Sequence, residues 1–169
     1  VRIAAEHIAS LERYPVACIC FGPANPYIDK RLQRFCDTIE QRTGRAVEQR
    51  YIRYGQFEPE SGYVAMKSLL EETPRPAVVF GMNDMMALGA IRAILDAGLT
   101  IPDEIAVVGY DDMRFAEYIN PTLTTVRAPE VEVGSAAGQV LMNLINGQPM
   151  SERQVRLLPQ LIVRASSRK

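Results

Sequence analysis

Amide and carboxylate side chains follow two strand-like stretches of this sequence. Asn83 and Asp84 come after the apolar run 76–81, and Asp111 and Asp112 come after the run 104–110. Each pair could satisfy the free backbone N–H groups at the start of a helix, or it could hydrogen-bond a ligand. Spacing alone therefore leaves helix capping as the structural alternative to ligand binding at both places.

Two further residues could contact a ligand. Arg31 is predicted to lie in the first turn of a helix, where a cation opposes the helix dipole, so a role other than stability is indicated. Phe57 is an aromatic ring in the polar stretch YGQFEPES. The structural alternatives are a solvated side chain for Arg31 and packing against the adjacent helix for Phe57.

The elements that would position these residues follow from hydrophobic periodicity. Short apolar runs predict strands over 15–21, 47–54, 76–81 and 104–110. Repeats of 3.6 residues predict helices over 27–44, 59–72 and 84–98. Strands that alternate with helices in this way form right-handed βαβ units. The predicted fold class is therefore α/β, with a parallel sheet flanked by helices.

Parallel strands all end at the same edge of their sheet, and ligands of open α/β sheets bind in the crevice beyond that edge. Arg31, Phe57, Asn83 and Asp111 should meet there. A guanidinium, an aromatic ring, an amide and a carboxylate suit a small polar ligand such as a sugar, held by directional hydrogen bonds with one face stacked.

The composition excludes several functions. Nineteen basic and twenty acidic residues give the 169-residue chain a net charge of -1, so no overall field attracts it to nucleic acid or to anionic membrane. No nucleophile is paired with a base, and the single histidine, His7, is predicted far from the crevice. We therefore expect no enzyme activity, no metal and no cofactor. Three cysteines, an odd number, favour a reduced cytoplasmic setting, and no apolar run is long enough to span a membrane.

The pattern changes after Asp112. A β-branched stretch over 123–126 precedes a helix over about 130–146, and runs over 153–159 and 160–166 predict two short strands around Pro159. At the other end, the chain starts inside a helical stripe without a capping residue or an initiating Met. This start predicts a fragment of a longer protein.

The stretches FGMNDMMALG, IAVVGYDD, LTTVR and LLPQLIVRASS resemble the C-terminal half of LacI/GalR transcriptional regulators. The resemblance begins at AAEHIASL and covers essentially the whole chain. It implies a helix-turn-helix followed by a two-lobed effector domain of the periplasmic-binding-protein type (type I), with the ligand between the lobes. It also implies a cytoplasmic homodimer that senses a small-molecule effector and contacts operator DNA only through its N-terminal domain.

The same resemblance divides the chain. Residues 1–121 would form the C-terminal lobe, 122–149 would be a crossover segment of the N-terminal lobe, and 150–169 would return to the C-terminal lobe. The DNA-binding domain and most of the N-terminal lobe would be absent. The helix over about 130–146 would then lack its partner, so its apolar stripe should cause this chain to associate as a dimer or by segment exchange.

Matched by motif, Asn83 and Asp111 correspond to residues that hydrogen-bond the effector, and Phe57 corresponds to an aromatic residue that often stacks on it. Arg31 opens the family pattern RLxGF, which reads RLQRF here. Arg34 thus stands where glycine is usual, and a bulky cation there would narrow the pocket or add a charge.

Two alternatives stay open at this point. A periplasmic solute-binding protein of a transporter shares the fold but would carry a signal peptide, and the ending LLPQLIVRASS favours the regulator. A receiver domain phosphorylated at Asp111 would carry an acidic pair after its first strand, where this sequence reads CFGPAN.

Overall fold

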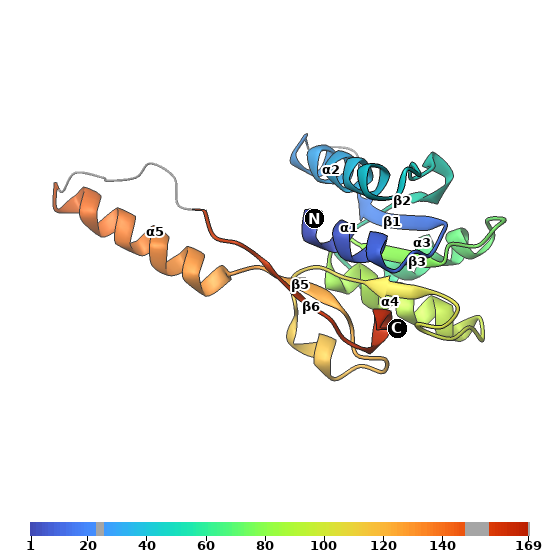
Figure 1. The fold of residues 1–169 in the computed structure, drawn as a ribbon. Helices are drawn as coiled ribbons and strands as arrows, with labels where there is room; N and C mark the ends of the chain where they lie inside the picture. The colour runs from blue at the N-terminus through green and yellow to red at the C-terminus, as the bar shows by residue number, and fades with distance from the viewer. Residues whose placement is uncertain (23–25, 148–155, 169) are drawn as a thin grey trace.

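Four parallel strands form the central sheet of the protein, in the order β2-β1-β3-β4. The computed structural model describes residues 1–22, 26–147 and 156–168 (Figure 1). The strands are β1 (Val16–Phe21), β2 (Ile52–Gly55), β3 (Val78–Gly81) and β4 (Ala106–Val108). All neighbouring pairs in the sheet are parallel. The predicted α/β class is therefore confirmed.

Helices cover both faces of this sheet. They are α1 (Arg2–Ser10), α2 (Pro26–Thr43), α3 (Pro59–Leu70) and α4 (Asp84–Asp96). The chain moves from β1 to β2 in one direction and from β2 through β3 to β4 in the other, so right-handed crossovers place α2 and the α3–α4 pair on opposite faces. Accordingly, α1 packs on α2 and α3 packs on α4.

Burial on both faces explains why β1 is apolar at every position. All six of its residues are buried, as expected for a parallel strand between two helical layers. The helices reach the sheet through their apolar stripes. For example, the ring of Phe35 on α2 stacks on Phe80 of β3, with 4.9 Å between the ring centroids.

The four strands of the sheet are shorter than their predicted ranges, and two of them differ most. The prediction over 47–54 is wrong in its first half, because Gln49–Tyr51 forms a 3-10 turn (η1). The buried ring of Tyr51 explains this turn, since its hydroxyl donates a 2.7 Å hydrogen bond to the Pro74 carbonyl. The run 104–110 forms a strand only over Ala106–Val108.

The C-terminal part leaves the sheet and returns to it. Its elements are η2 (Arg114–Glu117), β5 (Thr125–Arg127), α5 (Glu130–Ile145), β6 (Gln160–Ile162) and η3 (Ala165–Ser167). Strands β5 and β6 pair antiparallel, and Figure 1 shows α5 extending away from the sheet beyond them.

No residue of α5 is buried. Of the predicted strand 153–159, residues 156–159 form no strand, and 153–155 lie outside the described residues. Of the predicted strand 160–166, Gln160–Ile162 forms a strand, and Ala165–Ser167 forms a 3-10 turn instead. Within residues 1–22, 26–147 and 156–168, no helix is long and apolar enough to cross a membrane.

Candidate functional site

The carboxyl ends of the four parallel strands lie at one edge of the sheet. Strand β1 lies between β2 and β3, so the connection from β1 to β2 and the connection from β2 to β3 cross the sheet in opposite directions. A crevice opens beside such a reversal, between loops that leave the sheet in opposite directions. The four predicted site residues come from the segments that follow β1, β2, β3 and β4 in turn.

Arg31 bridges two of these segments. It lies in the second turn of α2 rather than the predicted first turn, because the helix begins at Pro26. Its guanidinium carbon lies 4.7 Å from the centre of the Tyr110 ring, and Nη2 donates a long, 3.4 Å hydrogen bond to the Met82 carbonyl. A half-buried arginine held over an aromatic face in this way has a fixed position.

Asp111 follows Tyr110 in a strained backbone conformation, with φ of 111°. Its N–H donates a 2.9 Å hydrogen bond to the carbonyl of Val126. Burial raises the pKa of Asp111 to about 6, with Arg31 acting to lower it and Glu130 acting to raise it further. The structural alternative of helix capping does not apply to this acidic pair, because the cap position of η2 is Met113 and no side chain caps it.

Asn83 caps α4. Its Oδ1 accepts a 2.8 Å hydrogen bond from the Met86 N–H, and the residue is 5% exposed. The structural alternative that the sequence left open for Asn83 is therefore correct for its oxygen. Because this oxygen is occupied, the amide nitrogen is the atom of Asn83 that can hydrogen-bond a ligand.

Phe57 is 66% exposed in the loop between β2 and α3. Its ring stacks on Phe21 at the end of β1, with 4.0 Å between centroids and an interplanar angle of 23°. The structural alternative for Phe57 was packing against the adjacent helix, whereas the ring stacks on the end of a strand. The stack leaves the second face of an apolar ring available at the carboxyl edge.

A cavity of about 500 Å³ lies beside Asp111, on the side of the crossover segments. Arg127 and the start of α5 line it, together with residues 157, 158 and 160. Arg31, Phe57 and Asn83 do not line this cavity. Asp111 therefore lies between the part of the sheet edge that carries Arg31 and the cavity lined by Arg127 and the start of α5.

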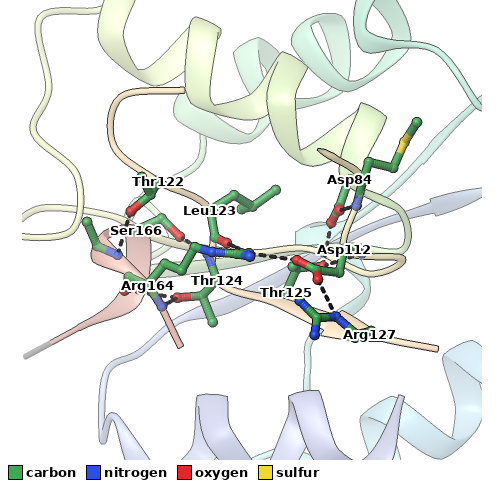
Figure 2. A network of polar contacts seen from close by, with 11 residues as sticks. Asp84, Asp112, Thr122, Leu123, Thr124, Thr125, Arg127, Arg164 and Ser166 are labelled. Atoms are coloured by element: carbon green, nitrogen blue, oxygen red, sulfur yellow. Dashed lines mark hydrogen bonds and ion pairs between the residues drawn. The ribbon is translucent and has the colours of Figure 1, made fainter. Parts of the chain in front are cut away.

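Asp84 has a role that sequence reasoning missed. Its fully buried carboxylate accepts hydrogen bonds from the Thr125 hydroxyl (2.6 Å) and the Met113 N–H (2.7 Å) (Figure 2). Burial raises the pKa of Asp84 to about 6 against these two hydrogen bonds, and the neighbouring carboxylates Asp111 and Asp112 add to the rise. The only sequence signal was an acid in a first helical turn, which is too common to identify a buried partner.

His7 belongs to a hydrogen-bond network with Ser167 and Thr124. Its Nε2 lies 2.7 Å from the Ser167 hydroxyl, which donates onward to Thr124 at 2.8 Å. Burial lowers the pKa of His7, which favours the neutral ring. In the part of the chain that the structure describes, no group of three or more His, Cys, Asp or Glu side chains could hold a metal ion.

Known proteins are similar to this chain in sequence and in fold. The family model of the periplasmic binding protein-like domain matches residues 5–167. The HTH-type transcriptional repressor PurR of Proteus mirabilis is 40% identical over 136 residues, which is 80% of this chain and 40% of the repressor. The chain thus spans well under half the length of the curated relatives that it matches.

Solved structures agree with the sequence comparison. A regulatory protein of the LacI family from Chloroflexus aggregans is 30% identical with a TM-score of 0.91, over 98% of this chain and 59% of that one. The transcriptional regulator CelR in complex with cellobiose is 30% identical with a TM-score of 0.87, over 98% of this chain and 50% of CelR. The chain belongs to the periplasmic binding protein-like domain family, in the form that LacI/GalR transcriptional regulators use as their effector-binding domain.

Proposed function

We propose that this chain is the effector-sensing part of a DNA-binding transcriptional regulator and catalyses no reaction. A small polar molecule, in our proposal a sugar, binds at the carboxyl edge of the sheet through Arg31, Phe57, Asn83 and Asp111. Operator DNA is bound by a part of the regulator outside these 169 residues. The similarity to repressors and to a cellobiose-bound regulator supports this proposal.

The observation that carries the ligand proposal is the position of Arg31 over Tyr110, on the same side as the partly buried carboxylate of Asp111. The cation and the acceptor can together hold vicinal hydroxyl groups by charge-assisted hydrogen bonds. The exposed face of Phe57 can stack on the apolar face of a sugar ring. A carboxylate kept partly out of water with a raised pKa is typical of a functional site.

The mechanism is a change of equilibrium between two arrangements of the lobes. A ligand shifts such an equilibrium only by its difference in affinity for the two states. The shift then reaches the DNA-binding part as a coupling free energy. No bond is made or broken in the effector.

We assign residues 1–121 to the C-terminal lobe, 122–149 to a crossover segment of the N-terminal lobe and 150–169 to the return. The absence of buried residues in α5, which extends away from the sheet beyond β5 and β6, supports the assignment of the crossover. Residues 148–155 and 169, which the last two segments include, lie outside the described residues.

We also propose that the regulator is a cytoplasmic homodimer. An apolar groove of about 570 Å³ between α3 and α4 supports a second copy as the partner. Tyr63, Val64 and Leu88 line it, and Val64 is 67% exposed. An exposed apolar groove on two well-packed helices suits a symmetric interface.

A ligand screen tests the proposal. Thermal unfolding of the complete regulator is measured with a panel of neutral mono- and disaccharides, cellobiose included. A ligand that binds only the folded state raises the melting temperature, and the rise grows with the logarithm of the ligand concentration once this exceeds the dissociation constant. A sugar that stabilises the protein and alters operator binding is the expected result. A protein that responds to none of the panel, but to a ligand of another chemistry, would remove the sugar from the proposal.

A further inference from the structure

The carboxylate of Asp112 faces two arginines from distant parts of the chain. Oδ2 accepts a 2.6 Å hydrogen bond from Nε of Arg127. Nη1 of Arg164 lies 2.8 Å from Oδ1, in the geometry of an ion pair rather than a linear hydrogen bond. Figure 2 shows both arginines reaching the carboxylate from different segments of the chain. The Asp112 side chain is only 6% exposed.

These arginines mark the two strands of the crossover. Arg127 ends β5, which leads out to α5, and Arg164 follows β6, which leads back. Arg164 is itself fastened to the outgoing strand, because its Nη1 donates to the Leu123 carbonyl (2.9 Å) and its N–H donates to the Thr124 hydroxyl (2.8 Å). One carboxylate therefore contacts both the outgoing strand and the segment that follows the returning strand.

The backbone brings this contact next to the candidate ligand carboxylate. Asp111 and Asp112 are consecutive, and both have positive φ, 111° and 52°. The N–H of Asp111 donates to Val126 (2.9 Å), and that of Asp112 donates to the Thr125 hydroxyl (3.3 Å). A strained conformation of two neighbouring residues persists only where surrounding contacts fix it. The two hydrogen bonds of these N–H groups both go to β5.

We propose that Asp112 is a positioning residue for the effector site. Its ion pairs with Arg127 and Arg164 lock both crossover strands to the loop that presents Asp111, so the ligand contact and the direction of the crossover are set together. The inference rests on the proposed function, in which Asp111 contacts the effector. It adds a specific structural link between that contact and the lobe arrangement.

The two arginines stabilise the ionised form of Asp112, which the ion pairs require. Burial opposes ionisation of Asp112, but the two arginines outweigh it and hold the pKa of Asp112 below its ordinary value. Arg164, 13% exposed, is the sheltered partner, and Arg127, 53% exposed, is the solvent-facing one. Loss of one partner of a sheltered ion pair leaves an uncompensated charge. Neutralising Asp112 removes both ion pairs, and neutralising Arg127 removes the ion pair to β5, so either change should loosen the contact between the Asp111 loop and the crossover.

The pKa of Asp111 indicates whether the ion pairs of Asp112 with Arg127 and Arg164 are intact. The charges that act on it come from both sides: Arg31 belongs to α2, and Glu130 begins α5 beyond the crossover. If the crossover loosens, Glu130 moves away and water reaches Asp111. The pKa of Asp111 should then fall from about 6 towards its ordinary 3.8.

The experiment is carbon-13 NMR titration of the Asp111 carboxyl in the complete protein without effector, comparing wild type, Asp112→Asn and Arg127→Gln. A direct charge effect would lower the pKa of Asp111 when Asp112 loses its negative charge and raise it when Arg127 loses its positive charge. Loosening of the crossover lowers it in both variants. We expect a lower pKa of Asp111 in both.

Hydrogen exchange gives a second readout on the same samples. The N–H groups of Gly109 and Asp111, which bond to Thr124 and Val126, should exchange about tenfold faster in both variants. The N–H of Met82, bonded to Ile19 in the sheet, should keep its wild-type rate. Glu72→Gln is the matched control, because it breaks the similar Arg53–Glu72 pair (2.6 Å) far from the crossover.

Several results would overturn the proposal. These are opposite shifts of the Asp111 pKa in the two variants, unchanged exchange at Gly109 and Asp111, an equal effect of Glu72→Gln, or loss of protection at Met82, which would make the contact one of general stability. Failure of the proposed function is a different result. In that case effector binding does not depend on Asp111, whereas the effector-free titration still shows the lock.

Discussion

The hydroxyl of Thr125 donates a 2.6 Å hydrogen bond to the buried carboxylate of Asp84 and so ties the first turn of α4 to the crossover strand β5. Thr125→Val keeps the shape of the side chain and removes the donor. Because the carboxylate stays buried with one hydrogen bond fewer, we expect a loss of about 1–3 kcal/mol in the free energy of unfolding. Urea unfolding followed by circular dichroism measures it.

Thr100→Val is the control for this prediction. The Thr100 hydroxyl also donates to a carboxylate, that of Glu104 (2.9 Å), but at an exposed position. Its replacement should change the stability by no more than about 0.5 kcal/mol. Equal losses in the two variants would show that burial of Asp84 does not strengthen its dependence on the Thr125 hydroxyl.

Asp111 should make the stability of the protein depend on pH. Its pKa is about 6 in the folded chain against an ordinary 3.8. Between these values the unfolded chain ionises first, so the free energy of unfolding falls as the pH rises from about 4 to about 6 and stays lower above that. Asp84 acts in the same direction, so the informative quantity is the difference between wild type and Asp111→Asn.

We expect Asp111→Asn to be more stable than wild type by about 1 kcal/mol at pH 7.5, after reducing the full effect of the shift for partial exposure. At pH 4 this pH-dependent gain should disappear. Unfolding in urea at the two pH values gives the comparison. A gain of the same size at both would assign it to relief of the positive φ instead of to the carboxylate charge.

Gly89 should be intolerant of any side chain. A Cβ at this position would lie 1.9 Å from the carbonyl oxygen of Pro59, at the contact between α3 and α4. Gly89→Ala should therefore push the helices apart and cost about 1–3 kcal/mol. Gly134→Ala on α5 meets no atom within 4 Å and should instead stabilise the chain by up to about 1 kcal/mol. Thermal unfolding distinguishes them, and similar effects of the two changes would be inconsistent with close helix packing.

The exposed face of α5 should make this 169-residue chain associate. Leu141 and Leu144 are 57% and 56% exposed, and Val133 is 53% exposed. Apolar side chains in this number are rarely left in water on a monomer. Multi-angle light scattering should give at least a dimer, and Leu141→Lys combined with Leu144→Lys should shift the chain towards the monomer. A monomeric wild type at high protein concentration would contradict this expectation.

Periodicity was sufficient to predict the order of strands and helices and the edge at which they end. The contact of Arg31 with Tyr110 was not predictable, because it joins α2 to the end of a strand much later in the chain. The ion pairs of Asp112 were not predictable for the same reason, because its two arginines lie 15 and more residues away along the chain. The sequence was sufficient to predict that the candidate residues follow strands that end at one edge of the sheet. Which residues contact one another there depends on tertiary packing.

The central claim is that an effector binds at the carboxyl edge through Asp111 and Phe57, and titration calorimetry tests it most directly. The ligand is the first sugar that stabilises the complete regulator, and the variants are Asp111→Ala and Phe57→Ala, with Asp96→Ala as an exposed acidic control. We predict that Asp111→Ala weakens binding roughly 10- to 100-fold, that Phe57→Ala also weakens it, and that Asp96→Ala leaves it unchanged. Wild-type affinity in both Asp111→Ala and Phe57→Ala would contradict the account.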